Sequence, residues 1–175
     1  LFVHMGITYM TLLKMFTSID IKHFLKSMAP VQLLGFSTSS SGATLPVTMK
    51  RCEKDLGISE EISSFVLPLG ATINMDGTAL YQGVAAVFIA QAVGMDLTLA
   101  NQFTIVATAV LASIGTAAVP GAGIIMLIII LEAINVPSEG IALILGVDRI
   151  LDMIRTATNV TGDATVASVM DSLER

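Results

Sequence analysis

The sequence has no tryptophan, a single cysteine and few charged residues. Only 13% of its 175 residues are Asp, Glu, Lys or Arg, whereas 54% are hydrophobic. No lysine or arginine occurs between Lys54 and Arg149. A soluble protein with a large core still needs a charged face on most of its helices, so this composition favours a membrane protein. The lone Cys52 excludes an internal disulfide.

The last apolar segment carries a regular series of polar residues. They recur at steps of four, three, four and four residues, namely Asp148, Asp152, Arg155, Asn159 and Asp163. On an α-helix this spacing forms one narrow stripe. Charged groups at membrane depth are costly unless they face a cavity, a partner or a ligand, so the stripe predicts a functional site.

Two short apolar arms flank a serine-rich run. The first arm covers residues 24–36, the run covers Ser37–Gly42, and the second arm ends in Lys50, Arg51 and Lys54. Neither arm can cross a bilayer, which takes about 20 residues. We therefore expect a re-entrant hairpin that returns to the side it left. The alternative is a serine-rich surface loop between two ordinary helices.

Residues 62–94 form a segment long enough to cross a membrane, but residues 74–78, NMDGT, interrupt it. Weak helix formers and an acid at bilayer depth are costly unless they line a cavity or coordinate something. Asp76 is therefore a candidate functional residue. The alternative is a structural carboxylate that a neighbouring helix satisfies.

A second pair of arms follows at residues 102–112 and 124–134. Each arm would be about 16 Å long, roughly half a bilayer core. The intervening residues 113–123 are rich in glycine and contain Pro120, which a continuous helix would not tolerate. This pattern predicts a second re-entrant hairpin.

The expected fold is an all-α membrane protein with two opposed re-entrant hairpins and two transmembrane helices, arranged as an inverted repeat. The basic residues that end the first hairpin place its base in the cytoplasm. The expected segments are the end of a truncated transmembrane helix (1–20), the first hairpin on the cytoplasmic side (21–57), a transmembrane helix broken at 74–78 (58–98), the second hairpin on the extracellular side (99–137), and a last transmembrane helix with a cytoplasmic C-terminus (138–175).

Four segments carry a family resemblance. They are residues 38–46 (TSSSGATLP), 74–78 (NMDGT), 113–123 (SIGTAAVPGAG) and 152–163 (DMIRTATNVTGD). In this order they resemble the signatures of the dicarboxylate/amino acid:cation symporter family, which includes the glutamate and aspartate transporters. The resemblance covers nearly the whole chain, from the sixth to the eighth transmembrane helix. It implies the C-terminal transport core of a homotrimer, assembled through a preceding scaffold. The methionine-rich composition favours a bacterial inner membrane.

The resemblance also implies an acidic amino acid held between the two hairpin tips. The implied substrate residues are Ser39, Ser41, Thr78, Val119, Gly123, Asp152, Arg155, Thr156 and Asn159. Asp152 would pair with the α-ammonium group, and Arg155 would bind the side-chain carboxylate through its planar fork. A substrate that lacks the ammonium group would leave Asp152 unpaired, and one that lacks the side-chain carboxylate would leave Arg155 unpaired. The alternative is that Asp152 and Arg155 form only an intrahelical ion pair.

Co-transported sodium ions are the further implication of the resemblance. The implied ligands are Gly70, Thr72, Asn74, Met75, Asp76, Ser113, Ile114, Thr116, Asn159 and Asp163. Carboxylate and carbonyl oxygens suit a hard cation. Coupling to protons instead of sodium stays open.

No enzyme is expected, because no Ser/His/Asp set or paired-aspartate context is present and both His4 and His23 lie outside the motifs. A channel would also use re-entrant tips, but a mixed-charge site suits a carrier. A neutral amino acid carrier and a C4-dicarboxylate carrier of the same family stay open. The expected mechanism is alternating access, with the hairpins as gates.

Overall fold

The computed structural model describes residues 1–174, and every regular element among them is a helix. The elements are α1 (Phe2–His4), the π-helical turn η1 (Met5–Tyr9), α2 (Met10–Phe16), α3 (Ile21–Thr38), α4 (Ser41–Lys54), α5 (Glu60–Ile73), α6 (Asp76–Ala92), α7 (Leu99–Ile114), α8 (Ala122–Ala133), the 3-10 turn η2 (Ser138–Ile141) and α9 (Ala142–Glu174). The all-helical prediction is confirmed. Within residues 1–174, none of the helices combines the length and the apolar character needed to cross a membrane.

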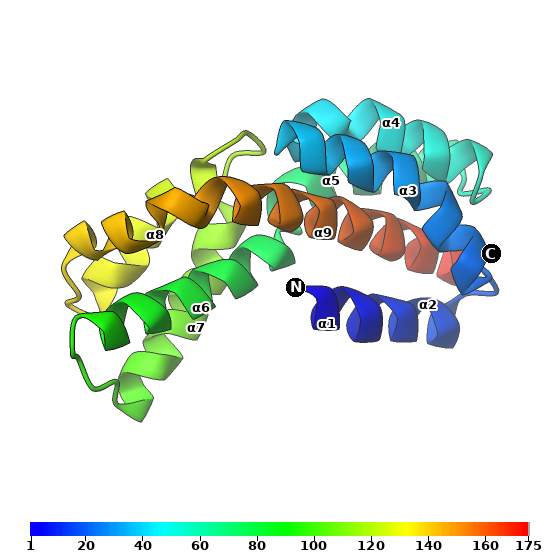
Figure 1. Cartoon of the computed structure of the whole chain (residues 1–175). Coiled ribbons are helices and arrows are strands. Elements are labelled where there is room, and N and C mark those ends of the chain that lie inside the picture. The colour runs from blue at the N-terminus through cyan, green and yellow to red at the C-terminus, as the bar shows by residue number, and fades with distance from the viewer. Residues whose placement is uncertain (175) are drawn as a thin grey trace.

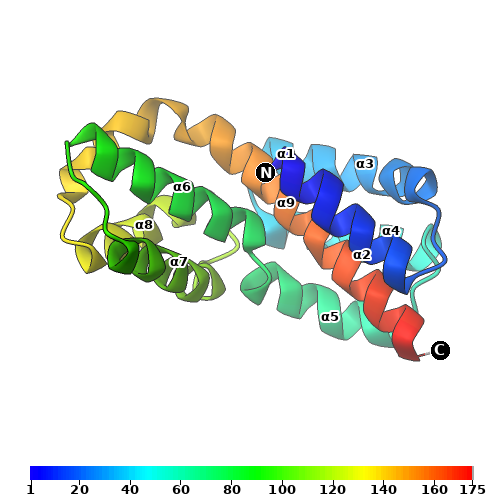
Figure 2. The same ribbon diagram turned by 90° about the horizontal axis from the view of Figure 1, so that it is seen from below.

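Helix α9, with 33 residues, runs through the middle of the molecule (Figure 1). Helices α3, α4 and α5 pack along its C-terminal half, and α6, α7 and α8 gather around its N-terminal half. Seen from below, α1 and α2 lie beside α9 (Figure 2). Apolar side chains pack closely within each group, with Ile89, Ile105 and Leu127 in one cluster and Phe24 and Leu67 in the other.

The tip of the first hairpin is shorter than predicted. Helix α3 continues to Thr38 and α4 begins at Ser41, which leaves only Ser39 and Ser40 between the helices. The hydroxyl of Thr38 donates to a carbonyl one turn earlier, which lets it remain helical. Ser39 reverses the chain in the left-handed region at φ 51°, and the hydroxyl of Ser40 caps α4 by accepting from the Ala43 amide.

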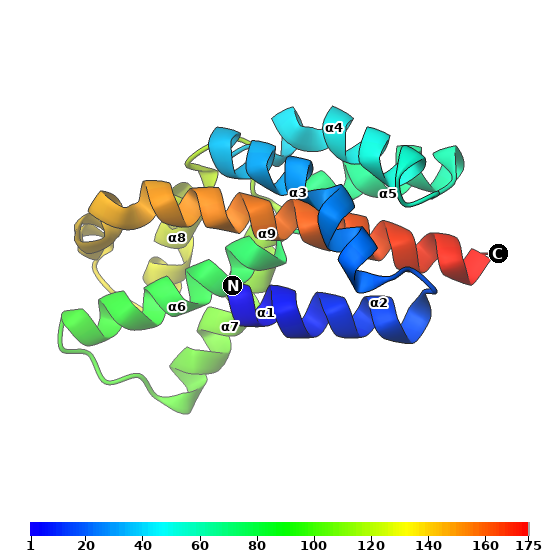
Figure 3. The same cartoon turned by 45° about the vertical axis from the view of Figure 1, so that its right-hand side comes forward.

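The second hairpin also departs from the predicted boundaries. Helix α7 is longer than the predicted arm 102–112, because the Thr98 hydroxyl accepts from the Asn101 amide and starts the helix at Leu99. Ser113 and Ile114 lie in its last turn and not in the tip. The tip covers residues 115–121. Figure 3 shows α7 below the N-terminal half of α9.

The break between α5 and α6 is confirmed, but it comprises only Asn74 and Met75. Both residues have ψ angles near 55°, outside the helical range. Asp76, Gly77 and Thr78 form the first turn of α6 instead of extending the break. The two helices therefore end and begin against α9, where their terminal polar groups can take partners from its stripe.

Candidate binding site between the hairpin tips

The polar stripe of α9 faces the interior, as its spacing predicted. All five of its residues are at most 7% exposed, namely Asp148, Asp152, Arg155, Asn159 and Asp163. The stripe passes between the two hydrophobic clusters, and the N-terminal turn of α6 lies against it. Buried charges of this kind need partners, since an unpaired charge in a low-dielectric interior is strongly unfavourable.

Arg155 is held from three sides. One guanidinium nitrogen donates to Asp152 Oδ1 at 2.6 Å, and the other terminal nitrogen lies 3.5 Å from Asp148 Oδ1. The guanidinium carbon is 3.9 Å from the centre of the Tyr81 ring, and the Tyr81 hydroxyl donates to Asp148 at 2.7 Å. The intrahelical pair between Asp152 and Arg155, left open from the sequence, is thus present in this structure.

The two hairpin tips touch each other. The Ser40 hydroxyl donates to the Ala118 carbonyl at 2.7 Å, and the Gly42 amide donates to the same oxygen at 3.3 Å. The second tip is also tied to α9, because the Gly121 amide donates to Asp152 Oδ2 at 3.0 Å. Gly121 has φ 78°, so the tip needs glycine at this position. These contacts join the two tips to each other and the second tip to α9.

A small cavity of about 20 Å³ lies under the joined tips, which is room for about one water molecule. Its lining includes eight of the nine predicted substrate residues, namely Ser39, Ser41, Thr78, Val119, Gly123, Asp152, Thr156 and Asn159. The ninth, Arg155, lies directly behind Gly123, where an added Cβ would come within 3.0 Å of its guanidinium group. The buried hydroxyl of Ser39 has no hydrogen-bond partner among the described residues.

Three of the predicted cation residues lie close together. Asp163 accepts from the Asn74 side-chain amide at 3.0 Å, and Gly70 lies so close that a Cβ there would be 2.6 Å from the Asp163 carboxylate. These three residues share a cavity of about 260 Å³ between α5 and α9. The Asn159 side chain accepts from the Gly77 amide at 2.8 Å and donates to Thr78 at 3.1 Å, so it ties the α6 terminus to α9.

Five further predicted cation residues are Thr72, Met75, Ser113, Ile114 and Thr116. Thr72 and Ile114 are exposed, whereas Met75 and Thr116 line the cavity beneath the tips. The hydroxyls of Thr72, Ser113 and Thr116 each donate to a carbonyl three or four residues earlier. Within residues 1–174, His, Cys, Asp and Glu side chains form no cluster of three suited to a metal ion.

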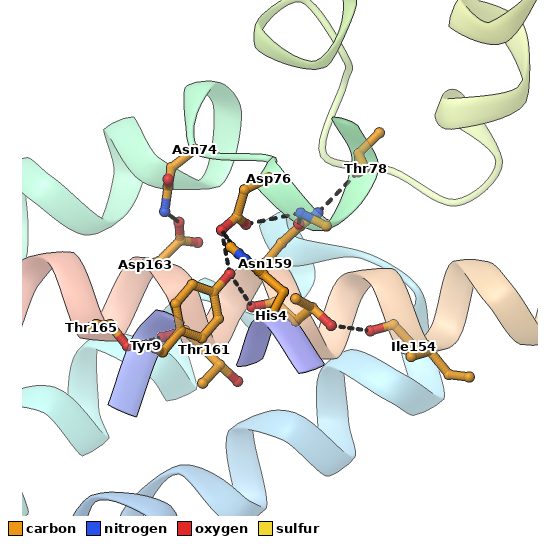
Figure 4. A network of polar contacts seen from close by, with 12 residues as sticks. His4, Tyr9, Asn74, Asp76, Thr78, Ile154, Asn159, Thr161, Asp163 and Thr165 are labelled. Carbon is orange, nitrogen blue, oxygen red and sulfur yellow. Dashed lines mark hydrogen bonds and ion pairs between the residues drawn. The ribbon is translucent and has the colours of Figure 1, made fainter. Parts of the chain in front are cut away.

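Sequence reasoning missed two partners of Asp76. His4 was placed outside the motifs, yet its Nε2 lies 2.7 Å from Asp76 Oδ2, and the Tyr9 hydroxyl donates to the same oxygen at 2.5 Å. Figure 4 shows these side chains converging on Asp76 beside Asn159. A histidine and a tyrosine in an otherwise apolar segment were the available signal. Tyr81 and Gln82, one turn beyond the NMDGT motif, were missed in the same way. The Tyr81 hydroxyl donates to Asp148, and the Gln82 side-chain amide donates to the Gly123 carbonyl in the wall of the cavity.

Two helical hairpins thus meet over a buried site that carries both positive and negative charge. The chain belongs to the sodium:dicarboxylate symporter family, which it matches over residues 1–173. This confirms the resemblance drawn from its four motifs. The family and the relatives are transporters, not enzymes.

Three relatives illustrate the similarity. Excitatory amino acid transporter 1 of Rattus norvegicus is 46% identical over 152 residues, covering 87% of this chain and 28% of the relative. Excitatory amino acid transporter 3 of Mus musculus is 49% identical, with 87% and 29% covered. The proton/sodium-glutamate symport protein of Bacillus subtilis is 49% identical over 156 residues, with 89% and 36% covered. The chain therefore spans about a third of the length of these relatives.

Proposed function

We propose that this chain forms the substrate-binding and cation-binding core of a symporter that takes up aspartate or glutamate with sodium. The observation that carries this proposal is the pair of opposite buried charges, Asp152 and Arg155, beside a small cavity under the tips. The names of the relatives, which are glutamate and excitatory amino acid transporters, support the same substrate class.

Substrate binding would exchange one set of charge pairs for another. The α-ammonium group of the substrate replaces Arg155 as the partner of Asp152. The side-chain carboxylate of the substrate forms an ion pair with the Arg155 guanidinium group. Both buried charges then remain paired with and without substrate, which avoids the cost of an isolated buried ion. The hydroxyls of Ser39 and Ser41 bind the α-carboxylate, with help from the Asn159 amide. Because the cavity holds about one water molecule, the second tip has to move to admit the substrate.

The rest of the predicted lining completes this site. Thr156 supports Asp152 and the substrate ammonium group, Thr78 lies beside Arg155, and Val119 and Gly123 contribute backbone groups from the second hairpin. All four residues line the cavity.

Sodium would bind at two carboxylates. Asp163 acts with oxygens of Gly70, Asn74 and Asn159, and Asp76 forms a second site. The proximity of Gly70, Asn74 and Asp163 supports the first. A third site beneath the second tip would use Thr72, Met75, Ser113, Ile114 and Thr116. The family description and the Bacillus subtilis relative support coupling to a cation.

The architecture we propose is an inverted repeat. Residues 21–57 and 99–137 form re-entrant hairpins that enter from the cytoplasmic and extracellular sides, and residues 58–98 and 138–175 supply the transmembrane helices. The contact between the tips, through Ser40 and Ala118, supports hairpins that approach each other from opposite sides. Residues 1–20 end a further transmembrane helix. The whole unit would move as one body against a trimeric scaffold in a bacterial inner membrane, giving alternating access.

Uptake into proteoliposomes tests the proposal. The full-length protein is reconstituted, and radiolabelled aspartate uptake is measured with a sodium gradient, a proton gradient or neither. We expect uptake only with sodium, and its loss in Asp152→Asn. The exposed residue Glu132 provides the control Glu132→Gln, which removes one negative charge away from the site. Uptake driven by protons alone would overturn the sodium assignment but keep the substrate site.

Proton coupling is the second candidate, because the Bacillus subtilis relative is a proton/sodium-glutamate symport protein. The proton arm of the same experiment decides it. Competition by unlabelled serine or succinate distinguishes a neutral amino acid carrier and a C4-dicarboxylate carrier from the proposed function. Saturable uptake that needs an ion gradient excludes a channel.

A further inference from the structure

A π-helical turn brings two side chains to one oxygen of Asp76. His4 immediately precedes η1 and Tyr9 ends it, so the two residues are five apart. In a regular α-helix residues five apart point about 140° away from each other. The i→i+5 pattern of a π-turn places them nearly one above the other. His4 and Tyr9 accordingly pack edge to face, with ring centres 4.8 Å apart, and both contact Asp76 Oδ2.

Tyr9 is seated deeply between α6 and α9. It is only 3% exposed, and its hydroxyl oxygen also lies 3.3 Å from the Thr158 carbonyl oxygen on α9. The hydroxyl further approaches Gly162, where an added Cβ would come within 2.6 Å of it. A larger residue at 162 would push the phenol away from Asp76. The glycine thus leaves the space in which the hydroxyl reaches the carboxylate.

The Asp76 carboxylate is consequently held at both oxygens. Oδ1 accepts from the Gly77 amide at 2.9 Å, and Oδ2 accepts from Tyr9 and contacts His4. Oxygens of Tyr9, Asp76 and Thr158 come from three separate elements and lie close together. Oxygen groups that are already in position bind a hard cation with less loss of conformational freedom.

We propose that Tyr9 is a positioning residue of the Asp76 cation site, and that the π-turn η1 orients the Tyr9 side chain toward Asp76. This inference rests on the proposed function, in which Asp76 binds sodium. The Tyr9 hydroxyl fixes the orientation of the carboxylate, and the Thr158 contact anchors the phenol to α9. Without the hydroxyl, the carboxylate rotates more freely and has to be ordered when sodium binds.

Sodium titration in the absence of aspartate tests the inference. The unfolding midpoint of the full-length protein in detergent is followed by circular dichroism as sodium chloride replaces choline chloride at constant ionic strength. Tyr9→Phe keeps the ring and removes only the hydroxyl, so we expect a folded protein whose sodium affinity is about tenfold weaker, the usual scale for a hydrogen bond to a charged group.

Tyr81→Phe is the matched comparison. It removes a second hydroxyl that donates to a buried aspartate, but on the Arg155 side of the site. It should therefore weaken aspartate binding and leave the sodium titration within about twofold of the wild type, a shift too small to reflect a lost charged hydrogen bond. Equal weakening of sodium by Tyr9→Phe and Tyr81→Phe would overturn the inference, because the effect would then not be specific to Asp76.

Asp76→Asn distinguishes a failure of the Tyr9 role from a failure of the proposed cation role of Asp76. If Asp76→Asn leaves sodium affinity unchanged, the proposed cation role of Asp76 fails. If Asp76→Asn weakens sodium while Tyr9→Phe does not, only the role of Tyr9 is overturned. A lower sodium-free midpoint in Tyr9→Phe with an unchanged sodium affinity would show that Tyr9 has a purely structural role, which also overturns the inference.

Discussion

The first turn of α6 lies so close to α9 that we expect any side chain at position 77 to destabilise the protein. A Cβ at this position would lie 2.7 Å from the Asn159 side-chain oxygen and 3.1 Å from the Arg155 carbonyl oxygen. Neither neighbour can easily give way, since one belongs to the backbone and the other already accepts from the Gly77 amide at 2.8 Å. Gly77→Ala therefore separates the two helices or turns Asn159 away.

The expected cost follows from three effects. Overpacking costs about 2 kcal/mol, and loss of the Asn159 hydrogen bond costs about 1 kcal/mol. The better helix propensity of alanine offsets about 1 kcal/mol. Gly77→Ala should thus lower the free energy of unfolding by about 2 kcal/mol, which corresponds to a fall of about 4–8 °C in the unfolding midpoint for a chain of this size.

Gly83 in the same helix provides the matched control. A Cβ at Gly83 meets no atom within 4 Å, so Gly83→Ala keeps the propensity gain without the clash and should raise the midpoint by about 2–4 °C. Circular dichroism is the appropriate assay, because the chain has no tryptophan. A midpoint for Gly77→Ala at or above that of Gly83→Ala would refute the close packing described here.

Three further predictions concern the proposed site. Arg155→Cys should abolish aspartate uptake and favour neutral substrates, since the only buried cation of the stripe is lost; unchanged aspartate affinity would contradict its role. Asp163→Asn should weaken the sodium dependence of uptake about tenfold or more while leaving substrate choice unchanged, measured as the sodium concentration for half-maximal uptake. Ser39→Ala should leave the substrate-free unfolding midpoint equal or higher, because the buried hydroxyl has no partner, but should weaken aspartate binding measured by calorimetry.

Several features of the structure depend only on local sequence pattern and could be predicted from it. Helical periodicity placed Asp148 to Asp163 on one buried face. Weak helix formers located the break within residues 74–78, of which only Asn74 and Met75 are non-helical. Glycine and proline located the second tip. Boundaries near serine and threonine were less accurate, because side-chain bonds such as that of Thr38 keep these residues helical.

Which distant groups meet is set by the tertiary structure. It paired Arg155 with Asp148 and Tyr81 as well as Asp152, and it brought Ser40 against Ala118. It also turned His4 and Tyr9 toward Asp76, through a π-turn that no periodicity in the sequence indicates. The physical reason is that spacing along a helix fixes which face a residue occupies, whereas its partner is set by how whole helices pack against each other.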